Sequence, residues 1–510
     1  MATPSNSAPA EAPGHDARVR LAIISAAAVL FLASLGQTSV STALPTIVGQ
    51  LGGLDHITWV ITAYLLASTV GAPVFGKLGD LFGRRAALQG GIAVFLLGAL
   101  VGGFADSLWV LVAGRFIQGM GGGGLIVVAM ATVADVLPPR ERGRAQGKLA
   151  AVFGVSTIIG PLTGGFLVQH LSWQWIFWIN LPVGLVAFAV LSWALEPRPA
   201  RARPSIDYLG AGLLAVTLSS LVVIVSAGGV SLPWGSPAIL VLVAVLTGGF
   251  AGFVLTERRA KEPILPLGLF RINNFVVSNT VGMIVGAAMF GTITFVPMFM
   301  QVVKGLDPAM SGLFLVPMMV GLIGMSNVAG RYMARTGRYK MLPVISTLVL
   351  GLGMVCMATV TPQTPNVLLV LYIFTAGVGI GPVMSVSVTA IQNAVPREMV
   401  GVGTASVNMF RMIGGSVGTA AFGALFATGL AARLAEMGVA GIGRGQLTGA
   451  ALAGMSDADR TLVAEAIAGA LHPVFWWAAL LGVLASAAAM LMQERVLEED
   501  YPAAERGPAE

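Results

Sequence analysis

Long apolar segments alternate with short polar turns along almost the whole chain. A helix needs about 20 predominantly apolar residues to cross a bilayer. Breaking the chain at charged residues and at clusters of Pro and Gly leaves about fourteen such segments, at 20–45, 57–76, 86–105, 109–136, 146–169, 174–195, 208–228, 237–256, 274–300, 311–330, 342–361, 366–391, 403–430 and 473–493. The pattern predicts an all-α integral membrane protein with about 14 transmembrane helices.

Composition and the placement of charge agree with this interpretation. Of the 510 residues, 56% are hydrophobic and only 10% are charged, against about 25% charged in a soluble domain. Lys and Arg concentrate in the cytoplasmic loops of membrane proteins. With both termini cytoplasmic, the predicted outer loops hold only Lys304, Arg433, Arg444 and Arg460. The net charge of +6 is therefore an orientation signal rather than a sign of nucleic-acid binding.

Two hairpins repeat one motif and divide the chain into halves. Residues 76–85 read G-K-L-G-D-L-F-G-R-R and residues 330–339 read G-R-Y-M-A-R-T-G-R-Y, with the outer glycines seven positions apart in each. They follow the second and the tenth span, so two spans between them are an insertion, giving 6+2+6 spans. Such repeats are common in secondary transporters. We expect an N-terminal six-helix bundle over 20–195, a connector with two extra helices over 196–272, and a C-terminal six-helix bundle over 273–493.

The ends of the chain and one long loop lie outside this pattern. Residues 1–19 are polar and predict a disordered cytoplasmic tail, and residues 494–510 predict a second cytoplasmic tail. Residues 431–472 are predicted as an outside loop. Within this loop, Ser456 is a candidate N-cap for a short amphipathic helix lying at the membrane surface. A poorly ordered loop is the alternative.

The fifth span is unusually rich in glycine and also contains a proline. Residues 154–165 read G-V-S-T-I-I-G-P-L-T-G-G. A mid-helix glycine costs about 1 kcal/mol and a proline about 3 kcal/mol in water, whereas in a membrane small residues let helices approach closely. The pattern predicts tight helix packing and, as a sharper hypothesis, a sliding or hinge surface made by Gly154, Gly160, Pro161, Gly164 and Gly165.

These motifs together resemble one transporter family. Residues 111–121 read L-V-A-G-R-F-I-Q-G-M-G, and further matching stretches lie at 41–47, 138–144, 173–182 and 408–416. With the first hairpin and the glycines of the fifth span, they make the chain similar to the major facilitator superfamily, and within it to the fourteen-span drug:proton antiporters of the QacA/EmrB type. The resemblance covers residues 20–493. It implies the major facilitator fold and export of drugs or antibiotics in exchange for protons by alternating access.

The resemblance implies a conformational latch in the first hairpin. Its residues are Gly76, Asp80, Gly83, Arg84 and Arg85, and the latch is closed in the outward-facing state. A helix N-terminus attracts negative charge, so the Asp80 carboxylate can accept hydrogen bonds from a facing helix. The two glycines allow a tight turn, and the arginines lie at the anionic inner leaflet.

Two arginines fall within predicted spans, and a charge within a span is a functional-site hypothesis. Arg115 lies in the fourth span, where the resemblance implies that it faces the central cavity and influences proton coupling; a place near the outer headgroups is the alternative. Arg411 lies closer to the middle of the thirteenth span, three residues after Asn408. We expect a cavity role for it, with a structural interhelical bond as the alternative.

The chain departs from the family pattern in its first span. The family usually reads L-D-x-T where residues 35–38 read L-G-Q-T, so Gly36 replaces the expected proton-carrying aspartate. A proton carrier must titrate, as a carboxylate in a partly dry cavity does, and no Asp or Glu lies deep in a predicted span. Three alternatives remain. Proton coupling uses Asp135 or Asp80 near the cytoplasmic face, or it is lost and the protein is an uncoupled facilitator. In the third alternative, position 36 carries a substitution.

The predicted cavity offers no buried carboxylate for a cationic substrate. Apolar, flexible side chains suit promiscuous ligands, and two arginines within spans favour neutral or anionic amphipathic compounds. Candidate lining residues are Gln37, Tyr64, Met289, Phe290, Phe295, Met298, Asn408, Arg411 and Met412. Each Met or Phe among them is alternatively a packing or lipid-facing residue.

Other functional classes receive little support from the sequence. It contains no P-loop and no HExxH motif, and its four histidines lack metal-ligand spacing. We expect no enzymatic activity, no cofactor and no metal. The expected protein is a monomer in the inner or plasma membrane of a bacterium, and its partners are small substrates, protons and lipid. An importer on the same fold and a transport-dead sensor or scaffold are the alternatives.

Overall fold

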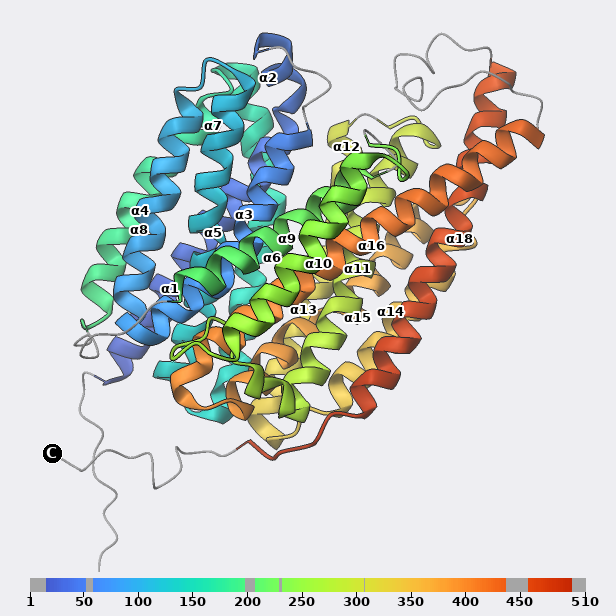
Figure 1. Cartoon of the computed structure of the whole chain (residues 1–510). Coiled ribbons are helices and arrows are strands. Elements are labelled where there is room, and N and C mark those ends of the chain that lie inside the picture. The colour runs from blue at the N-terminus through green and yellow to red at the C-terminus, as the bar shows by residue number, and fades with distance from the viewer. Residues whose placement is uncertain are drawn as a thin grey trace, which may run out of the picture.

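The computed structural model describes residues 15–51, 58–197, 207–228, 232–306, 308–436 and 457–497, and long helices dominate it (Figure 1). The longer helices are α1 His15–Thr38, α3 Thr58–Phe82, α4 Arg84–Gly103, α5 Leu108–Val136, α6 Pro139–His170, α8 Asn180–Ala194, α9 Tyr208–Ala227, α10 Pro237–Glu257, α11 Asn273–Val302, α13 Val316–Thr336, α14 Met341–Met357, α15 Asn366–Ala394, α16 Val400–Glu436 and α18 Asp457–Met490. Short helices are α2 Leu44–Leu51, α7 Trp175–Trp178 and α12 Pro308–Leu313, with 3-10 turns at Ser39–Thr42, Leu267–Arg271 and Arg397–Met399. In the described residues, 13 helices are long and apolar enough to cross a membrane, and α14 is a shorter apolar helix, which confirms the prediction of about 14 spans.

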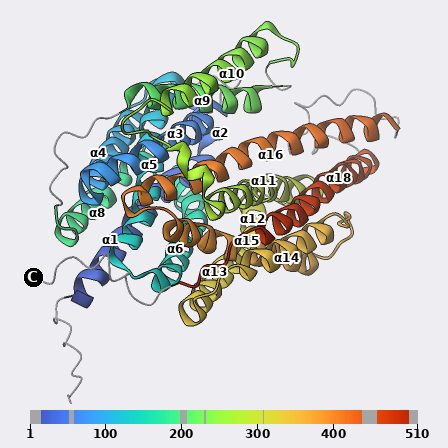
Figure 2. The same ribbon diagram turned by 60° about the horizontal axis from the view of Figure 1, so that its bottom comes forward.

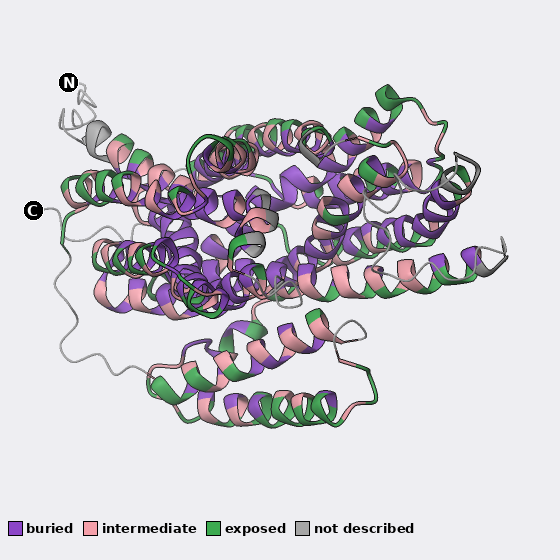
Figure 3. Ribbon diagram, turned by 90° about the horizontal axis from the view of Figure 1, so that it is seen from above, coloured by how far each residue is buried: buried purple, intermediate pink, exposed green. Residues whose placement is uncertain are grey.

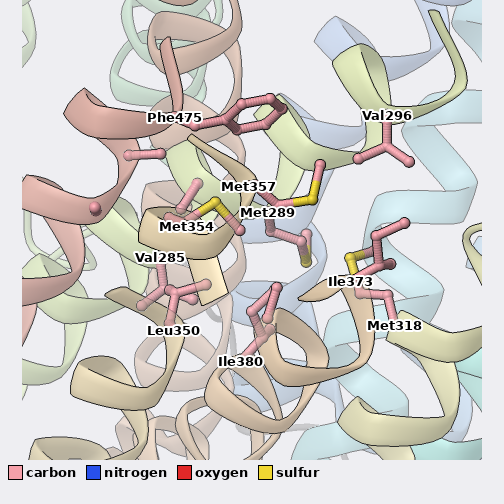
Figure 4. Packing of buried hydrophobic residues seen from close by; sticks show 14 of the residues in the cluster. Val285, Met289, Val296, Met318, Leu350, Met354, Met357, Ile373, Ile380 and Phe475 are labelled. Carbon is pink, nitrogen blue, oxygen red and sulfur yellow. The ribbon is translucent and has the colours of Figure 1, made fainter. Parts of the chain in front are cut away.

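The helices form two bundles joined by a connector (Figure 2). Helices α1 and α3 to α8 make up the N-terminal bundle, and α11 to α18 make up the C-terminal bundle. The core of the C-terminal bundle is rich in methionine, and Met289, Met318, Met354 and Met357 lie in one buried cluster with Leu350 and Ile373 (Figure 4). Because methionine is unbranched and flexible, it fills irregular gaps between helices that cross at different angles.

The connector helices α9 and α10 lie beside the two bundles as a pair (Figure 3). Helix α9 packs against α3 of one bundle and α16 of the other, while α10 is the more exposed of the two. Lys77 Nζ of α3 lies 2.7 Å from Glu262 Oε2, just after α10. The connector therefore packs against both bundles.

The structure corrects two predictions, one about the N-terminal tail and one about the long loop. Helix α1 already begins at His15, so residues 15–19 are not a disordered tail; residues 1–14 lie outside the described residues. Within the predicted second tail, 494–510, Leu497 is 4% exposed, and its N donates to Gly337 O at 2.9 Å. Positions 498–510 lie outside the described residues.

The predicted surface helix in the loop 431–472 is wrong. Helix α16 continues to Glu436, and α18 runs from Asp457 to Met490 without a break. Its apolar positions Val463, Ala466, Ile467 and Ala470 are at most 1% exposed, within the core of the C-terminal bundle. The apolar stripe thus faces protein rather than the membrane surface, and the proposed N-cap Ser456 lies outside the described residues.

The two bundles meet mainly along two helix crossings. Helix α3 packs on α16, and α6 packs on α13. A Cβ added to Gly401 would meet the Gly76 carbonyl, and a Cβ added to Gly330 would meet the Gly143 carbonyl at 2.5 Å. We call the end of the molecule with these two glycine pairs the latch end. The bundles are close there and diverge toward α2 and α12 (Figure 1).

Candidate functional site

The Asp80 carboxylate joins the two bundles at the latch end. It accepts hydrogen bonds from Gly401 N at 2.8 Å and Val402 N at 2.9 Å, at the N-terminus of α16. Arg84 Nη1 lies 2.7 Å from Asp80 Oδ1, and Arg84 Nε lies 2.9 Å from Asp135 Oδ2. One arginine therefore holds both carboxylates, and one carboxylate caps a helix of the other bundle. The sequence predicted the helix-capping contact of Asp80.

The two hairpin glycines serve different purposes. Gly83 has φ 87°, a left-handed conformation that favours glycine, and it forms the turn between α3 and α4. Gly76 lies inside α3 and forms no part of the turn; instead it lets α3 approach α16. The predicted turn role is therefore correct for Gly83 and wrong for Gly76. Arg85 Nη1 donates to Leu195 O at 3.0 Å and ties the hairpin to the end of α8.

A buried polar network at the latch end was missed by the sequence analysis. Arg142 of α6 donates to Gln392 O at 3.1 Å and to Asn393 Oδ1 at 2.8 Å, both on α15. Gln146 Nε2 and Gln392 Nε2 both donate to Met130 O, at 2.9 and 3.0 Å. Arg142 lies in the basic stretch 138–144 of the sequence, and glutamines in apolar surroundings were the available signal for this network.

Arg115 lies inside the N-terminal bundle. Its side chain is 1% exposed, and its Nη1 donates to Gly36 O at 2.8 Å and to Gln118 Oε1 at 2.7 Å. The guanidinium also lies 4.1 Å from the centre of the Tyr64 ring, which is a cation–π contact. The carbonyl of Gly36 thus meets the arginine at the position where the family pattern has an aspartate.

Arg411 is the second buried arginine within a span. It is 5% exposed, its Nη2 donates to Asn408 Oδ1, and its Nη1 lies 3.1 Å from Met384 Sδ of α15. Gly286 of α11 packs against the Arg411 backbone and Cγ, where a larger residue would collide. The side chain therefore lies where α11, α15 and α16 meet.

The glycines of the fifth span pack on two different partners. A Cβ added to Gly154 would lie 2.7 Å from Ile323 Cδ1 of α13, in the other bundle. A Cβ added to Gly160 would collide with Thr38 Oγ1 of α1, and Gly164 is buried as well. Gly165 has open space around it, and Pro161 lies within the unbroken helix α6. The prediction of tight packing is met at Gly154 and Gly160; the hinge stays a prediction.

The remaining lining candidates do not gather around one point. Met289 and Phe295 are each 4% exposed in the core of the C-terminal bundle, which favours their packing alternative. Phe290 and Met298 pack against the same core. Gln37 is half-buried, and its Oε1 has no hydrogen-bonding partner among the described residues.

Comparison with known proteins places the chain in a family. The family model of the Major Facilitator Superfamily matches residues 26–419. Multidrug transporter protein MdtP of Bacillus subtilis is 36% identical over 412 residues, which cover 81% of this chain and 76% of that protein. Multidrug resistance protein 3 of the same organism is 31% identical over 395 residues, 77% of each chain. The chain belongs to the Major Facilitator Superfamily.

One similar protein is longer than this chain. The uncharacterized MFS-type transporter Rv1877 of Mycobacterium tuberculosis is 42% identical over 405 residues, which cover 79% of this chain but only 59% of that protein. Among solved structures, the proton:xylose symporter XylE superimposes with a TM-score of 0.63 at 14% identity, over 93% of this chain and 95% of that chain. The human organic anion transporter MFSD10 gives 0.61 at 15% identity, over 92% and 99%. These likenesses confirm the fold.

Proposed function

We propose that this protein is a secondary active exporter of amphipathic small molecules, serving multidrug or antibiotic efflux by alternating access. The observation that carries the proposal is the latch end, where Asp80 caps α16 and closes one end of the interface between bundles. If the basic loops mark the cytoplasm, this closed end is cytoplasmic, and the conformation is outward-facing. The names of the two Bacillus relatives support multidrug transport, and the name "MFS-type efflux pump LUC4" of a Fusarium relative supports export.

We further infer that protons act on the cluster of Asp80, Arg84 and Asp135. Across the described spans, Asp and Glu lie at or near the helix ends, so none is available at mid-depth. A proton on either aspartate removes an ion pair from Arg84, and a proton on Asp80 also weakens its cap on α16. Proton binding would then favour opening of the latch end, which is a step that alternating access requires.

The alternative is an uncoupled facilitator, and Gly36 favours it. A backbone carbonyl meets Arg115 there, and a carbonyl cannot carry a proton at ordinary pH. Flux would then follow the substrate gradient alone.

Flux in proteoliposomes under an imposed pH gradient tests both functions. The probes are naphthalene-2-sulfonate and N-methylquinolinium, two permanently charged aromatic ions that cross bilayers poorly. Wild-type flux that rises with the gradient, and loses this dependence in Asp135→Asn, supports antiport at the latch. Gradient-independent flux supports the facilitator. Absence of flux for both probes would count against transport of amphipathic ions.

A further inference from the structure

Arg411 and Asn408 carry polar atoms that the surrounding protein does not satisfy. Asn408 is 2% exposed and Arg411 is 5% exposed. Arg411 Nε and Asn408 Nδ2 have no hydrogen-bonding partner among the described residues. One of the two partners of the guanidinium is the Met384 sulfur, and a thioether sulfur is a weak acceptor. A fork of five N–H donors therefore has one oxygen acceptor, that of Asn408.

Two other buried arginines have their N–H donors satisfied by acceptors within the protein. Arg142 donates to four oxygens, those of Ala134, Leu137, Gln392 and Asn393. Arg115 has three oxygen acceptors and an aromatic ring. In the described part of the chain no carboxylate forms an ion pair with Arg411. A buried cation without an anionic partner is costly, so its remaining donors suit an anionic ligand.

The position of Arg411 places it where α16 leaves the N-terminal bundle. Ala405, earlier on α16, packs against Ala72 of α3 and Val127 of α5. Beyond Arg411, Gly414 and Gly418 pack against α11 of their own bundle. The arginine therefore lies on α16 between Ala405, which contacts the N-terminal bundle, and the glycines that contact α11. A substrate that moves between the bundles along α16 would pass this stretch of the helix.

We propose that Arg411 and Asn408 form the recognition site for the anionic group of an amphipathic organic substrate, a carboxylate or a sulfonate. Arginine binds such groups through paired N–H donors, and the free amide of Asn408 adds a third donor. Met384 lies against the arginine, and its flexible thioether suits apolar bodies of varied shape. This inference rests on the proposed transport function and names the substrate class of its central site.

Ligand binding and flux with defined probes test the proposal on the full-length protein. Naphthalene-2-sulfonate is the anion, N-methylquinolinium is the cation of similar shape, and 2-naphthol is the neutral body for binding alone. Arg411→Met should weaken sulfonate binding and flux by about tenfold or more, while 2-naphthol binding is retained. The matched control is Arg433→Met, which removes one positive charge from the same helix and should leave sulfonate binding unchanged.

A second variant keeps the test valid if Arg411→Met does not fold. Asn408→Asp is nearly isosteric and places a carboxylate next to Arg411, so it should exclude the sulfonate while the protein stays folded. Equal sulfonate affinity in wild type, Arg411→Met and Asn408→Asp would overturn the proposal and leave Arg411 a structural residue. Wild-type flux of N-methylquinolinium without sulfonate flux would also overturn it while the transport function stands. Absence of flux for both ions would instead count against the transport function.

Discussion

Asp80 and Gly401 are 321 positions apart in the chain, yet the Asp80 carboxylate accepts a hydrogen bond of 2.8 Å from the Gly401 amide. The same carboxylate contacts Val402 N and Arg84. A negative charge at a helix N-terminus is stabilising, so this contact favours the conformation in which α3 and α16 touch. The second hairpin has Ala334 at the equivalent position, and only the first hairpin can form this bond.

The first prediction concerns this contact. Asp80→Asn keeps the size of the side chain and removes its charge, so the cap should weaken by about 1–2 kcal/mol. The population with an open latch end should rise by about tenfold. Distances between spin labels at the exposed positions Lys148 and Arg338, in a Cys356→Ser background, report this opening. An unchanged distance distribution would show that Asp80 does not hold the latch.

The second prediction concerns the missing aspartate. Gly36→Asp should raise pH-gradient-driven export, because the new carboxylate would lie next to Gln118 Nε2, which is 3.2 Å from an added Cβ. The same Cβ lies 2.5 Å from Phe95 Cζ, so crowding should destabilise the protein by about 1–3 kcal/mol.

Matched variants separate titration from crowding at position 36. Gly36→Asn has the same shape and cannot titrate, so it should show the crowding without the gain in gradient-driven export. Thermal unfolding measures the crowding, and proteoliposome flux measures the coupling. Equal export by Gly36→Asp and wild type would mean that position 36 is not the missing carrier.

The third prediction uses two glycines of one motif. Gly160→Ala places a methyl group against Thr38 Oγ1, whereas Gly165→Ala meets open space. The first substitution should cost about 1–3 kcal/mol of stability and reduce transport, because α6 can no longer approach α1. The second should be neutral in both measurements. Similar melting temperatures for the two variants would contradict the packing role assigned to Gly160.

The fourth prediction concerns the connector. Lys77 and Glu262 form an ion pair whose side chains are 10% and 34% exposed. Lys77→Glu should destabilise the protein, and adding Glu262→Lys should restore part of the loss, with a coupling of about 1 kcal/mol. Thermal unfolding at low and high salt measures this coupling. Purely additive effects would mean that the connector is held by its apolar contacts alone.

Hydropathy and charge placement were enough to predict the helices and the insertion. Each span can be predicted from its own residues alone, because a helix that crosses the bilayer needs about 20 apolar residues. The cap by Asp80 was also predictable, since a carboxylate in a Gly-rich hairpin is expected to bind a helix N-terminus or a cation. The surface helix at 457–470 failed because an apolar stripe looks the same whether it faces lipid headgroups or a neighbouring helix.

The sequence by itself determined the membrane class, the spans, the internal repeat and the absence of a mid-depth carboxylate from the predicted spans. Only the tertiary structure decided that Gly76 meets Gly401, that Gln392 meets Arg142, and that Arg411 keeps unsatisfied donors while Arg115 does not. The physical reason is the sequence distance between the residues involved. A span depends on the transfer of neighbouring residues into lipid, whereas these partners are far apart in the chain and meet only when the two bundles dock. Small residues allow many dockings, and the side chains that meet between the bundles select one.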